Sequence, residues 1–346
     1  MTTALTLRAP QNLPALAGMC GVVALLALAE LALGPVDLAP GQLIDALTGS
    51  GEGFETAILW QIRLPRLLLG IAVGTALALS GAALQGVLRN PLADPGLIGV
   101  TGGASLGAVL AIVLGDHIVG VLPNALRPWL LPLAAFIGAS LVISFVFTLS
   151  RRAGETSVAM LILAGVAVNA ITVAAIGALV YISDDQQLRD LTFWTMGSLG
   201  GSGWPLVGAA VFLTLIAAPA LLHQARALDL FQLGERAAFH SGLDVERSKR
   251  RIAVAISISV GAVTAAAGPI GFIGLVAPHL TRLLFSPRHQ ILLPASILMG
   301  IGLVLAADLV VRLSVPPAEP PIGLATSLIG GPFFLWLLLR RRPTHA

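Results

Sequence analysis

The feature that most constrains this chain is a series of ten long, charge-poor apolar segments. They cover residues 13–33, 64–88, 96–115, 129–149, 157–182, 204–222, 252–268, 271–285, 291–313 and 322–339. About 20 apolar residues are enough for an α-helix to cross the hydrocarbon core of a bilayer, and the hydrophobicity here does not alternate as it would in a membrane β-barrel. Charged residues make up only 11% of the chain, against about 25% in soluble domains. The sequence therefore predicts an all-α integral membrane protein, a single domain over residues 1–346. We expect about ten transmembrane helices, with short re-entrant or interfacial helices between them.

The longest hydrophilic interruption lies between the sixth and seventh apolar segments, at residues 222–251. It contains six basic residues: Arg226, Arg236, Arg247, Lys249, Arg250 and Arg251. Basic loops remain in the cytoplasm. Within it, Glu235 and Ala238 are spaced to share a helix face, and Gly242 is a typical helix stop. Thirty residues is long for a connection, so this pattern favours a short cytoplasmic helix that docks a soluble partner over a solvated connector.

The distribution of cations predicts the orientation. With both termini in the cytoplasm, 15 of the 20 basic residues fall on the cytoplasmic side. The excess of cations on one side is the signal that sets topology. The net charge of +3 is therefore an orientation signal spread over loops, and we expect no nucleic-acid partner.

Two polar regions stand out on the predicted outer side. Arg63 and Arg66 lie at the mouth of the second segment, where they either snorkel to the membrane interface or form a basic patch for an acidic external partner. Asp308 and Arg312 have the i,i+4 spacing of an ion pair on one helix. We expect a short helix at or near the membrane surface in each of two stretches, 34–62 and 183–204.

The fifth segment places Gly165, Asn169 and Thr172 on one helix face. A buried asparagine there either bonds a neighbouring helix or faces a transport pathway. The third and eighth segments are interrupted by glycine and proline, a pattern typical of discontinuous helices near such a pathway.

Several chemistries are disfavoured by what the chain contains. Lys249 is the only lysine and no Walker motif is present, so the chain has no P-loop of its own for ATP. Cys20 is the only cysteine, which excludes an intrachain disulfide. No Ser–His or paired-Asp arrangement suggests an intramembrane enzyme, and we expect no catalytic residues and no metal site.

An ion-coupled secondary transporter is the competing class. It needs acids at mid-membrane, and only Glu30 and Asp308 lie in or near the segments, towards their ends.

A set of ordered motifs between residues 62 and 339 resembles the permease subunits of type II ABC importers, the FecCD-type family of iron-siderophore, haem and cobalamin permeases. The main motifs are RLPRLLLGIAVGTALALSGAALQGVLRNPLADPGLIGVTGGASLGA, LILAGVAVN, LGERAAFHSGL, AGPIGFIGLVAPHLTRLL and PIGLATSLIGGPFFLWLLLRR.

This resemblance implies partners and a location. It implies a homodimer around a central pathway in the bacterial inner membrane, two ATP-binding subunits on the cytoplasmic loop, and a periplasmic binding protein on the outer face. No cofactor is bound permanently, and ATP binds the partner subunit.

The resemblance also implies roles for particular residues. Carried over from the family, Gly234, Glu235, Ala238 and Gly242 belong to the helices that couple to the ATPase. Arg63, Arg66 and Arg312 match outer arginines that meet acidic residues of the binding protein. The segment DDQQLRDLTFWTMGSLGG is most similar to haem permeases, so haem is the expected cargo, with a ferric siderophore or cobalamin as the alternatives.

Overall fold

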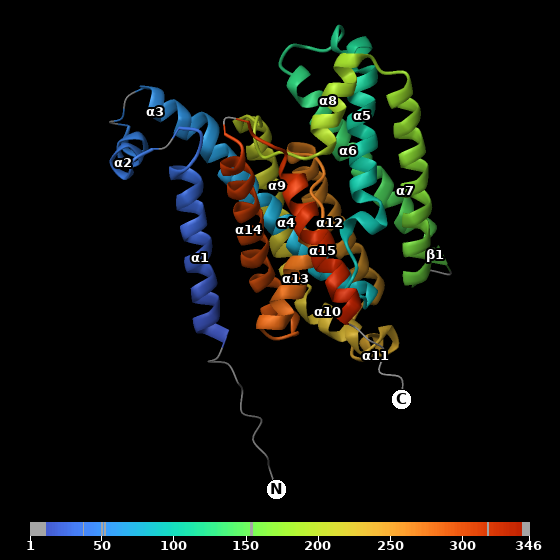
Figure 1. The fold of residues 1–346 in the computed structure, drawn as a ribbon. Coiled ribbons are helices and arrows are strands. Elements are labelled where there is room, and N and C mark those ends of the chain that lie inside the picture. The colour runs from blue at the N-terminus through green and yellow to red at the C-terminus, as the bar shows by residue number, and fades with distance from the viewer. Residues whose placement is uncertain are drawn as a thin grey trace.

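The computed structural model describes residues 12–36, 38–49, 51, 53–152, 155–316 and 318–340, and these form a bundle of helices (Figure 1). The first half contains α1 (Asn12–Ala32), α2 (Pro40–Thr48), α3 (Gly53–Ala57), the π-helix η1 (Ile58–Arg63), α4 (Leu64–Leu88), the 3-10 turn η2 (Pro95–Ile98), α5 (Val100–Val119), the 3-10 turn η3 (Arg127–Trp129), α6 (Leu130–Leu149) and α7 (Val158–Tyr181). The second half contains α8 (Asp185–Thr195), α9 (Trp204–Leu222), α10 (Ala225–Gln232), α11 (Glu235–His240), α12 (Val245–Ala267), α13 (Ile273–Leu284), α14 (His289–Ser314) and α15 (Ile322–Arg340). One small hairpin interrupts the helices, with β1 (Arg151–Arg152) antiparallel to β2 (Glu155–Thr156).

Seven helices in the described chain are long and apolar enough to cross a membrane. They are Pro14–Ala32, Gly53–Leu88, Arg127–Leu149, Val158–Tyr181, Trp204–Leu222, Val245–Ala267 and His289–Ser314. Three shorter apolar helices, Val100–Gly115, Ile273–Leu284 and Ile322–Leu335, correspond to the predicted third, eighth and tenth segments. The all-helical prediction is therefore confirmed, while seven of the ten predicted crossings reach full spanning length.

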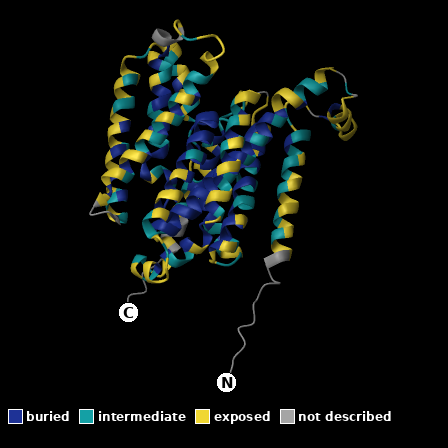
Figure 2. Cartoon of the chain, turned by 180° about the vertical axis from the view of Figure 1, so that it is seen from behind, coloured by how far each residue is buried: buried dark blue, intermediate teal, exposed yellow. Residues whose placement is uncertain are grey.

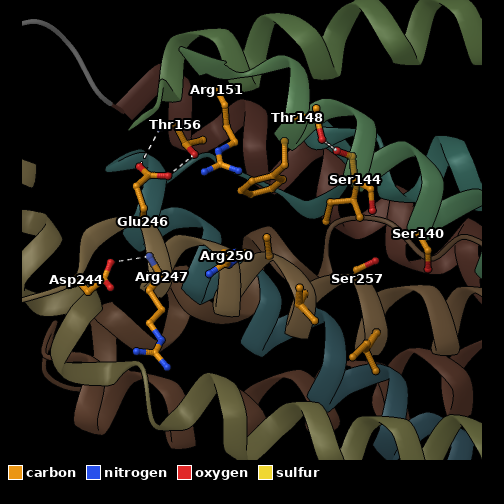
Figure 3. A pocket seen from close by; sticks show the side chains of 15 residues that line it. Ser140, Ser144, Thr148, Arg151, Thr156, Asp244, Glu246, Arg247, Arg250 and Ser257 are labelled. Atoms are coloured by element: carbon orange, nitrogen blue, oxygen red, sulfur yellow. Dashed lines mark hydrogen bonds between the residues drawn. The ribbon is translucent and has the colours of Figure 1, made fainter. Parts of the chain in front are cut away.

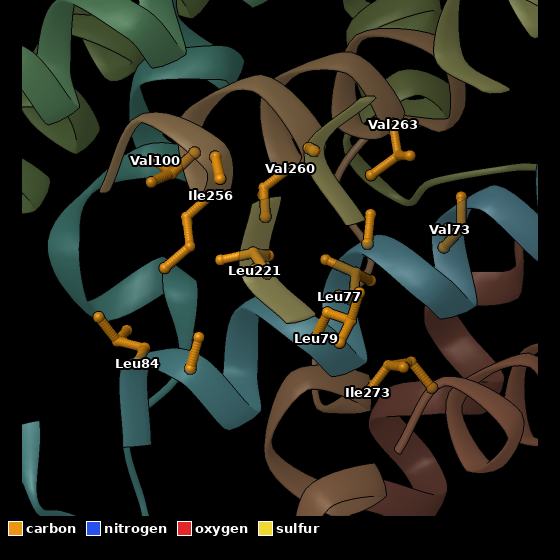
Figure 4. Packing of buried hydrophobic residues seen from close by; sticks show 14 of the residues in the cluster. Val73, Leu77, Leu79, Leu84, Val100, Leu221, Ile256, Val260, Val263 and Ile273 are labelled. Carbon is orange, nitrogen blue, oxygen red and sulfur yellow. The ribbon is translucent and has the colours of Figure 1, made fainter. Parts of the chain in front are cut away.

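The core forms around α4, which packs against α14, α13, α12 and α9. In its most apolar stretch 83% of residues are buried, against 6% for α1 at the edge of the bundle. Small residues allow this close approach: a Cβ added to Gly74 would lie 2.6 Å from the Ile301 Cα, and one added to Gly81 would lie 1.9 Å from the Gly274 carbonyl oxygen. Leucine and valine side chains of α4, α9 and α12 fill the remaining space (Figure 4).

The outer helices present apolar surface away from this core. Figure 2 shows the buried residues gathered in the middle of the bundle and exposed residues along the peripheral helices. On α7, for example, Leu163, Ile171 and Val173 are exposed. Exposed apolar faces of this length are expected where helices meet lipid or another membrane subunit.

The bundle has two distinct ends (Figure 1). We call the end that carries α10 and α11 the α10 end, and the opposite one, with α2, α3 and α8, the α2 end. The short helices expected in 34–62 and 183–204 are present as α2 and α8. Two details differ from the sequence prediction. Helix α12 already begins at Val245, inside the loop predicted for 222–251, and η1 runs directly into α4, so that the helix begins before the predicted residue 64.

Candidate functional site

The polar segment between α9 and α12 folds into two short helices, α10 and α11. Gly234 joins them with φ of 102°, a conformation that costs a side-chain-bearing residue free energy and glycine almost none. Gly242 ends α11 with φ of 81°, and the neighbouring backbone N–H of Leu243 donates to the Ala238 carbonyl at 3.1 Å. The predicted short helix and its glycine stop are therefore both present, and the turn fixes the direction of each helix.

A buried ammonium group holds α11 against the bundle. The Lys249 Nζ lies 2.7 Å from a Glu235 carboxylate oxygen and donates to the Thr156 carbonyl at 2.8 Å. Glu246 completes this clamp, because its carboxylate accepts from both the backbone N–H and the hydroxyl of Thr156 and lies 3.4 Å from Nζ. Lys249 is only 2% exposed, and Ala238 is fully buried beneath the helix. Glu235 therefore positions α11 as well as contributing charge to its surface.

A second set of contacts joins α10 to the membrane helices. The Asp229 carboxylate accepts from the His289 backbone N–H at 2.9 Å and lies 2.7 Å from the His289 Nδ1. It thereby caps the positive end of α14, whose first N–H groups have no partner within the helix. The Gln232 side chain donates to the Gly86 carbonyl of α4 at 3.1 Å, and Phe231 is buried. A displacement of α10 must therefore move α14, α4 or both.

The exposed side of α10 and α11 combines cations with apolar groups. Leu233 is 70% exposed and Phe239 is 67% exposed, and Arg236 lies between them in sequence. Exposed large apolar groups on a rigidly held polar segment mark an interaction surface. Sequence reasoning singled out Glu235 and Ala238 here and missed Phe239, although an aromatic residue within a basic loop was a usable signal.

At the α2 end the predicted docking arginines are buried. Arg66 makes a two-pronged ion pair with Asp308, at 2.7 and 3.0 Å, and a third contact with Glu319 at 2.5 Å. Arg63 donates to the carbonyls of Leu31 and Val36. The cluster joins α4 to α14 and to the loop before α15, so it is a tertiary contact rather than an open basic patch.

Arg312 is the third of these arginines, and its partner was predicted wrongly. Its guanidinium lies 2.6 Å from the Glu30 carboxylate of α1, and Asp308 pairs with Arg66 instead of with Arg312. The two residues share a helix, but α14 packs between α1 and α4, and each side chain finds a charged partner on a different neighbour. Buried charges require charged partners because their desolvation is costly. The Arg312–Glu30 pair meets this need only in part, since the Glu30 Oε1 and the Arg312 Nε form no hydrogen bond with the described residues.

The face of α7 that carries Gly165, Asn169 and Thr172 packs against η2 and the start of α5. Asn169 donates to the Gly96 carbonyl at 2.9 Å, and Thr172 bonds the Asn169 carbonyl at 2.9 Å. A Cβ on Gly165 would lie 2.2 Å from the Leu97 carbonyl oxygen. Of the two alternatives, bonding to a neighbouring segment is what this structure contains, and lining of a pathway stays a prediction.

The predicted break beside the eighth segment is present, whereas the one predicted at the start of the third segment is not. Thr101, Gly102, Gly103 and Ser105 lie within the continuous helix α5, and the irregular backbone precedes them at η2. Helix α12 stops at Ala267 and α13 starts at Ile273, with positive φ at Gly268 and Phe272 between them. Near η2, the Asp94 carboxylate accepts from the Gly96 N–H at 2.8 Å, and burial raises the pKa of Asp94. The break between α12 and α13 is covered only in part, because Gly268 is buried and Gly271 is exposed.

The comparison with known proteins decides the family. The model of the FecCD transport family matches residues 22–340, almost the whole chain.

This chain belongs to the FecCD transport family.

Several relatives of this FecCD chain have named functions. The hemin transport system permease protein HmuU of Yersinia pestis is 48% identical over 82% of this chain and 84% of its own length. The vitamin B12 import system permease protein BtuC of Klebsiella pneumoniae is 41% identical over 91% of this chain and 90% of its own. A solved metal-chelate type ABC transporter in an inward-facing conformation has a TM-score of 0.83 and 32% identity, covering 94% of this chain and 99% of that one. The resemblance inferred from the motifs is thereby confirmed.

Proposed function

We propose that this FecCD chain is the membrane permease subunit of an ATP-driven, binding-protein-dependent importer that moves haem from the periplasm to the cytoplasm. The haem assignment rests on the 48% identity to a hemin permease, against 41% to a vitamin B12 permease. Cobalamin is therefore the second candidate cargo. The chain itself acts as the gated conduit and not as the enzyme.

The observation that carries this proposal is the construction of α10 and α11. Both helices are fixed by buried contacts, through Lys249 for α11 and Asp229 for α10, while Leu233 and Phe239 face outwards. A rigid surface with exposed apolar groups is suited to receive a moving partner and to pass that motion on. Two ATP-binding subunits are the partners we assign to it, one on each copy of the chain, and ATP binds to them.

The charge distribution supports a cytoplasmic location for the α10 end. In the described chain this end has eight exposed arginines: Arg89, Arg151, Arg226, Arg236, Arg247, Arg250, Arg251 and Arg288. The α2 end has two exposed ones, Arg127 and Arg189. By the positive-inside rule the α10 end faces the cytoplasm. With the three shorter apolar helices counted as crossings, the chain spans the inner membrane ten times and both termini are cytoplasmic.

Helix α14 is the element that we assign to transmission. It is 26 residues long, or about 39 Å at 1.5 Å per residue. One end receives the Asp229 cap from α10, and the other end carries Asp308 and Arg312 in the buried charge cluster. ATP-driven closure of the partner subunits would shift the balance between inward-open and outward-open states through this helix.

The remaining partners follow from the other surfaces. A periplasmic binding protein would dock at the α2 end. One of its carboxylates would replace Glu319, which is 37% exposed, as a partner of Arg66, while the buried Arg63 and Arg312 would support the surface on which it docks. A second copy of the chain would cover the exposed apolar face of α7, so that the pathway runs between the two copies. Gly165, Asn169 and Thr172 lie on the opposite face of α7, and would border this pathway only when α7 separates from η2 and α5.

Reconstitution into proteoliposomes tests this function. The chain would be incorporated with its ATP-binding subunits, haem-loaded binding protein added on the opposite side, and proton and sodium gradients collapsed with ionophores. We expect haem uptake that requires ATP hydrolysis. Uptake of cyanocobalamin but not of haem would reassign the cargo, and gradient-driven uptake without the ATP-binding subunits would identify a secondary transporter.

A further inference from the structure

Two adjoining hollows flank the first turns of α12 at the α10 end. One of about 520 Å³ lies between α6 and α12 beside the hairpin (Figure 3), and one of about 530 Å³ lies between α9 and α12. Arg250, Val254 and Ile258 line both hollows. Their spacing of four residues makes them one ridge along α12.

Cations collect at the mouths of the two hollows. Arg151, Arg247 and Arg250 line the first, and Arg250, Arg251 and His223 line the second. These four arginines are exposed, and none of them forms a side-chain ion pair with another described residue. Their charge is therefore available to an external anion.

The two acids in the first hollow already have structural partners. Asp244 caps α12 by accepting from the Arg247 backbone N–H at 3.0 Å, and Glu246 is bound by Thr156 and Lys249. Among the described residues, no acid lines the second hollow. The balance of charge along the ridge is therefore positive, and it is strongest at Arg250 and Arg251.

Below the cations the two hollows differ. In the first, Ile143 and Phe147 of α6 alternate with four hydroxyl side chains, those of Ser140, Ser144, Thr148 and Ser257, whereas the second is lined by apolar groups such as Ile216 and Ala220 of α9. From Arg250 to Ile258 the ridge extends about 12 Å along α12. Val254 in the middle of this ridge is 52% exposed. Cations above largely apolar grooves, at one end of a bundle of membrane helices, match an amphiphile that enters from the bilayer.

We propose that an anionic phospholipid binds here, with its phosphate at Arg250 and Arg251 and its acyl chains in the two hollows on either side of α12. Basic pockets between membrane helices on the cytoplasmic side are suited to anionic headgroups. The lipid would pack on the same turns of α12 that supply Glu246 and Lys249 to the clamp on α11. Bound lipid would therefore stabilise the position of α11.

Native mass spectrometry of the intact chain, with its ATP-binding subunits attached, tests this site. The probes are dioleoyl phosphatidylglycerol, which is anionic, and dioleoyl phosphatidylethanolamine, which is zwitterionic. We expect tighter binding of the anionic lipid, and about a fivefold loss of its affinity for each arginine removed, so about 25-fold for Arg250→Gln with Arg251→Gln. Arg250→Lys should retain most of the affinity because it keeps the charge.

The matched control is Arg226→Gln, which removes an exposed cation of α10 at the same end but outside both hollows. It should leave lipid affinity unchanged, and thermal unfolding in detergent reports whether each variant is folded. Equal affinity for both lipids, or an equal loss in the control, would overturn the proposal. Displacement of the lipid by inorganic phosphate that binds equally tightly would also overturn the proposal, because the apolar walls would then contribute nothing to the affinity. Loss of affinity for the ATP-binding subunits with lipid binding intact would make the ridge a protein interface and would also overturn it.

Discussion

The two ends of the bundle use arginine in opposite ways. At the α2 end Arg66 and Arg312 are 3–4% exposed and pair with acids from other helices. At the α10 end Arg236, Arg250 and Arg251 are exposed and pair with no described acid. The same side chain therefore contributes to tertiary structure at one end and to surface charge at the other. Substitutions at the first end should act mainly on stability, and those at the second mainly on partners.

The largest effect is expected from breaking the buried cluster. Arg66→Leu leaves the Asp308 carboxylate buried without its two-pronged partner, which costs about 3–5 kcal/mol of folding free energy. The double variant Arg66→Leu with Asp308→Leu should recover most of that loss, since it removes both charges. Thermal unfolding in detergent measures both. Arg189→Leu, which removes an exposed arginine at the same end, should change stability by less than about 0.5 kcal/mol. Equal destabilisation by Arg66→Leu and Arg189→Leu would contradict the assignment of the cluster to tertiary structure.

The next largest effect is expected from charge reversal at Glu235. Glu235→Arg would set a second cation beside the buried ammonium of Lys249 and release the clamp on α11. We expect destabilisation of about 1–3 kcal/mol, from the loss of a hydrogen bond to a charged group, together with loss of ATP-driven uptake. Glu235→Gln keeps a hydrogen-bond acceptor and should retain more of both. Normal uptake by Glu235→Arg would remove α11 from the coupling path.

Substitution of Phe239 tests the contrast between the two ends of the bundle, because it should weaken the binding of a partner without destabilising the fold. Phe239→Ala removes an exposed ring, so stability should change by less than about 0.5 kcal/mol. Affinity for the ATP-binding subunits should fall by about 1–3 kcal/mol, or roughly 5- to 150-fold, as expected for an aromatic anchor. The matched control is Phe212→Ala, an equally exposed phenylalanine on α9. A loss of affinity in both variants, measured by titration with the ATP-binding subunit, would show that the effect is not specific to α11.

The smallest effect concerns the exposed member of the buried cluster. Glu319 is 37% exposed and binds Arg66 at 2.5 Å, so Glu319→Gln would leave more of the Arg66 charge available to an acidic binding protein. We expect about a threefold gain in docking affinity, worth roughly 0.6 kcal/mol and weaker at high salt. Glu55→Gln, on the same end in α3, serves as a control for the loss of one acid. An unchanged or weakened affinity in Glu319→Gln would indicate that Arg66 takes no part in docking.

Local patterns in the sequence predicted most of the helices but few of the contacts that make the site. Apolar runs were enough to predict most of the spans because a membrane helix must satisfy its own backbone, and the cations of 222–251 marked the segment that forms α10 and α11. The partner of Arg66 is 242 residues away, and Asp229 and His289 are 60 residues apart. No local spacing encodes such pairs, and the one ion pair predicted from local spacing, that of Asp308 with Arg312, was wrong. Similarly, the sequence grouped Lys249 with the surface cations of its loop, whereas the structure shows that it is buried.

The central claim is that ATP hydrolysis by cytoplasmic partner subunits is coupled to this chain through α10 and α11. Labelling of Phe239→Cys in a Cys20→Ser background, with a maleimide that cannot cross membranes, tests it most directly. The account predicts labelling in inside-out vesicles stripped of the ATP-binding subunits, protection when those subunits are restored, and no labelling in intact spheroplasts. Labelling from the outside of spheroplasts, or labelling that the ATP-binding subunits leave unchanged, would contradict it.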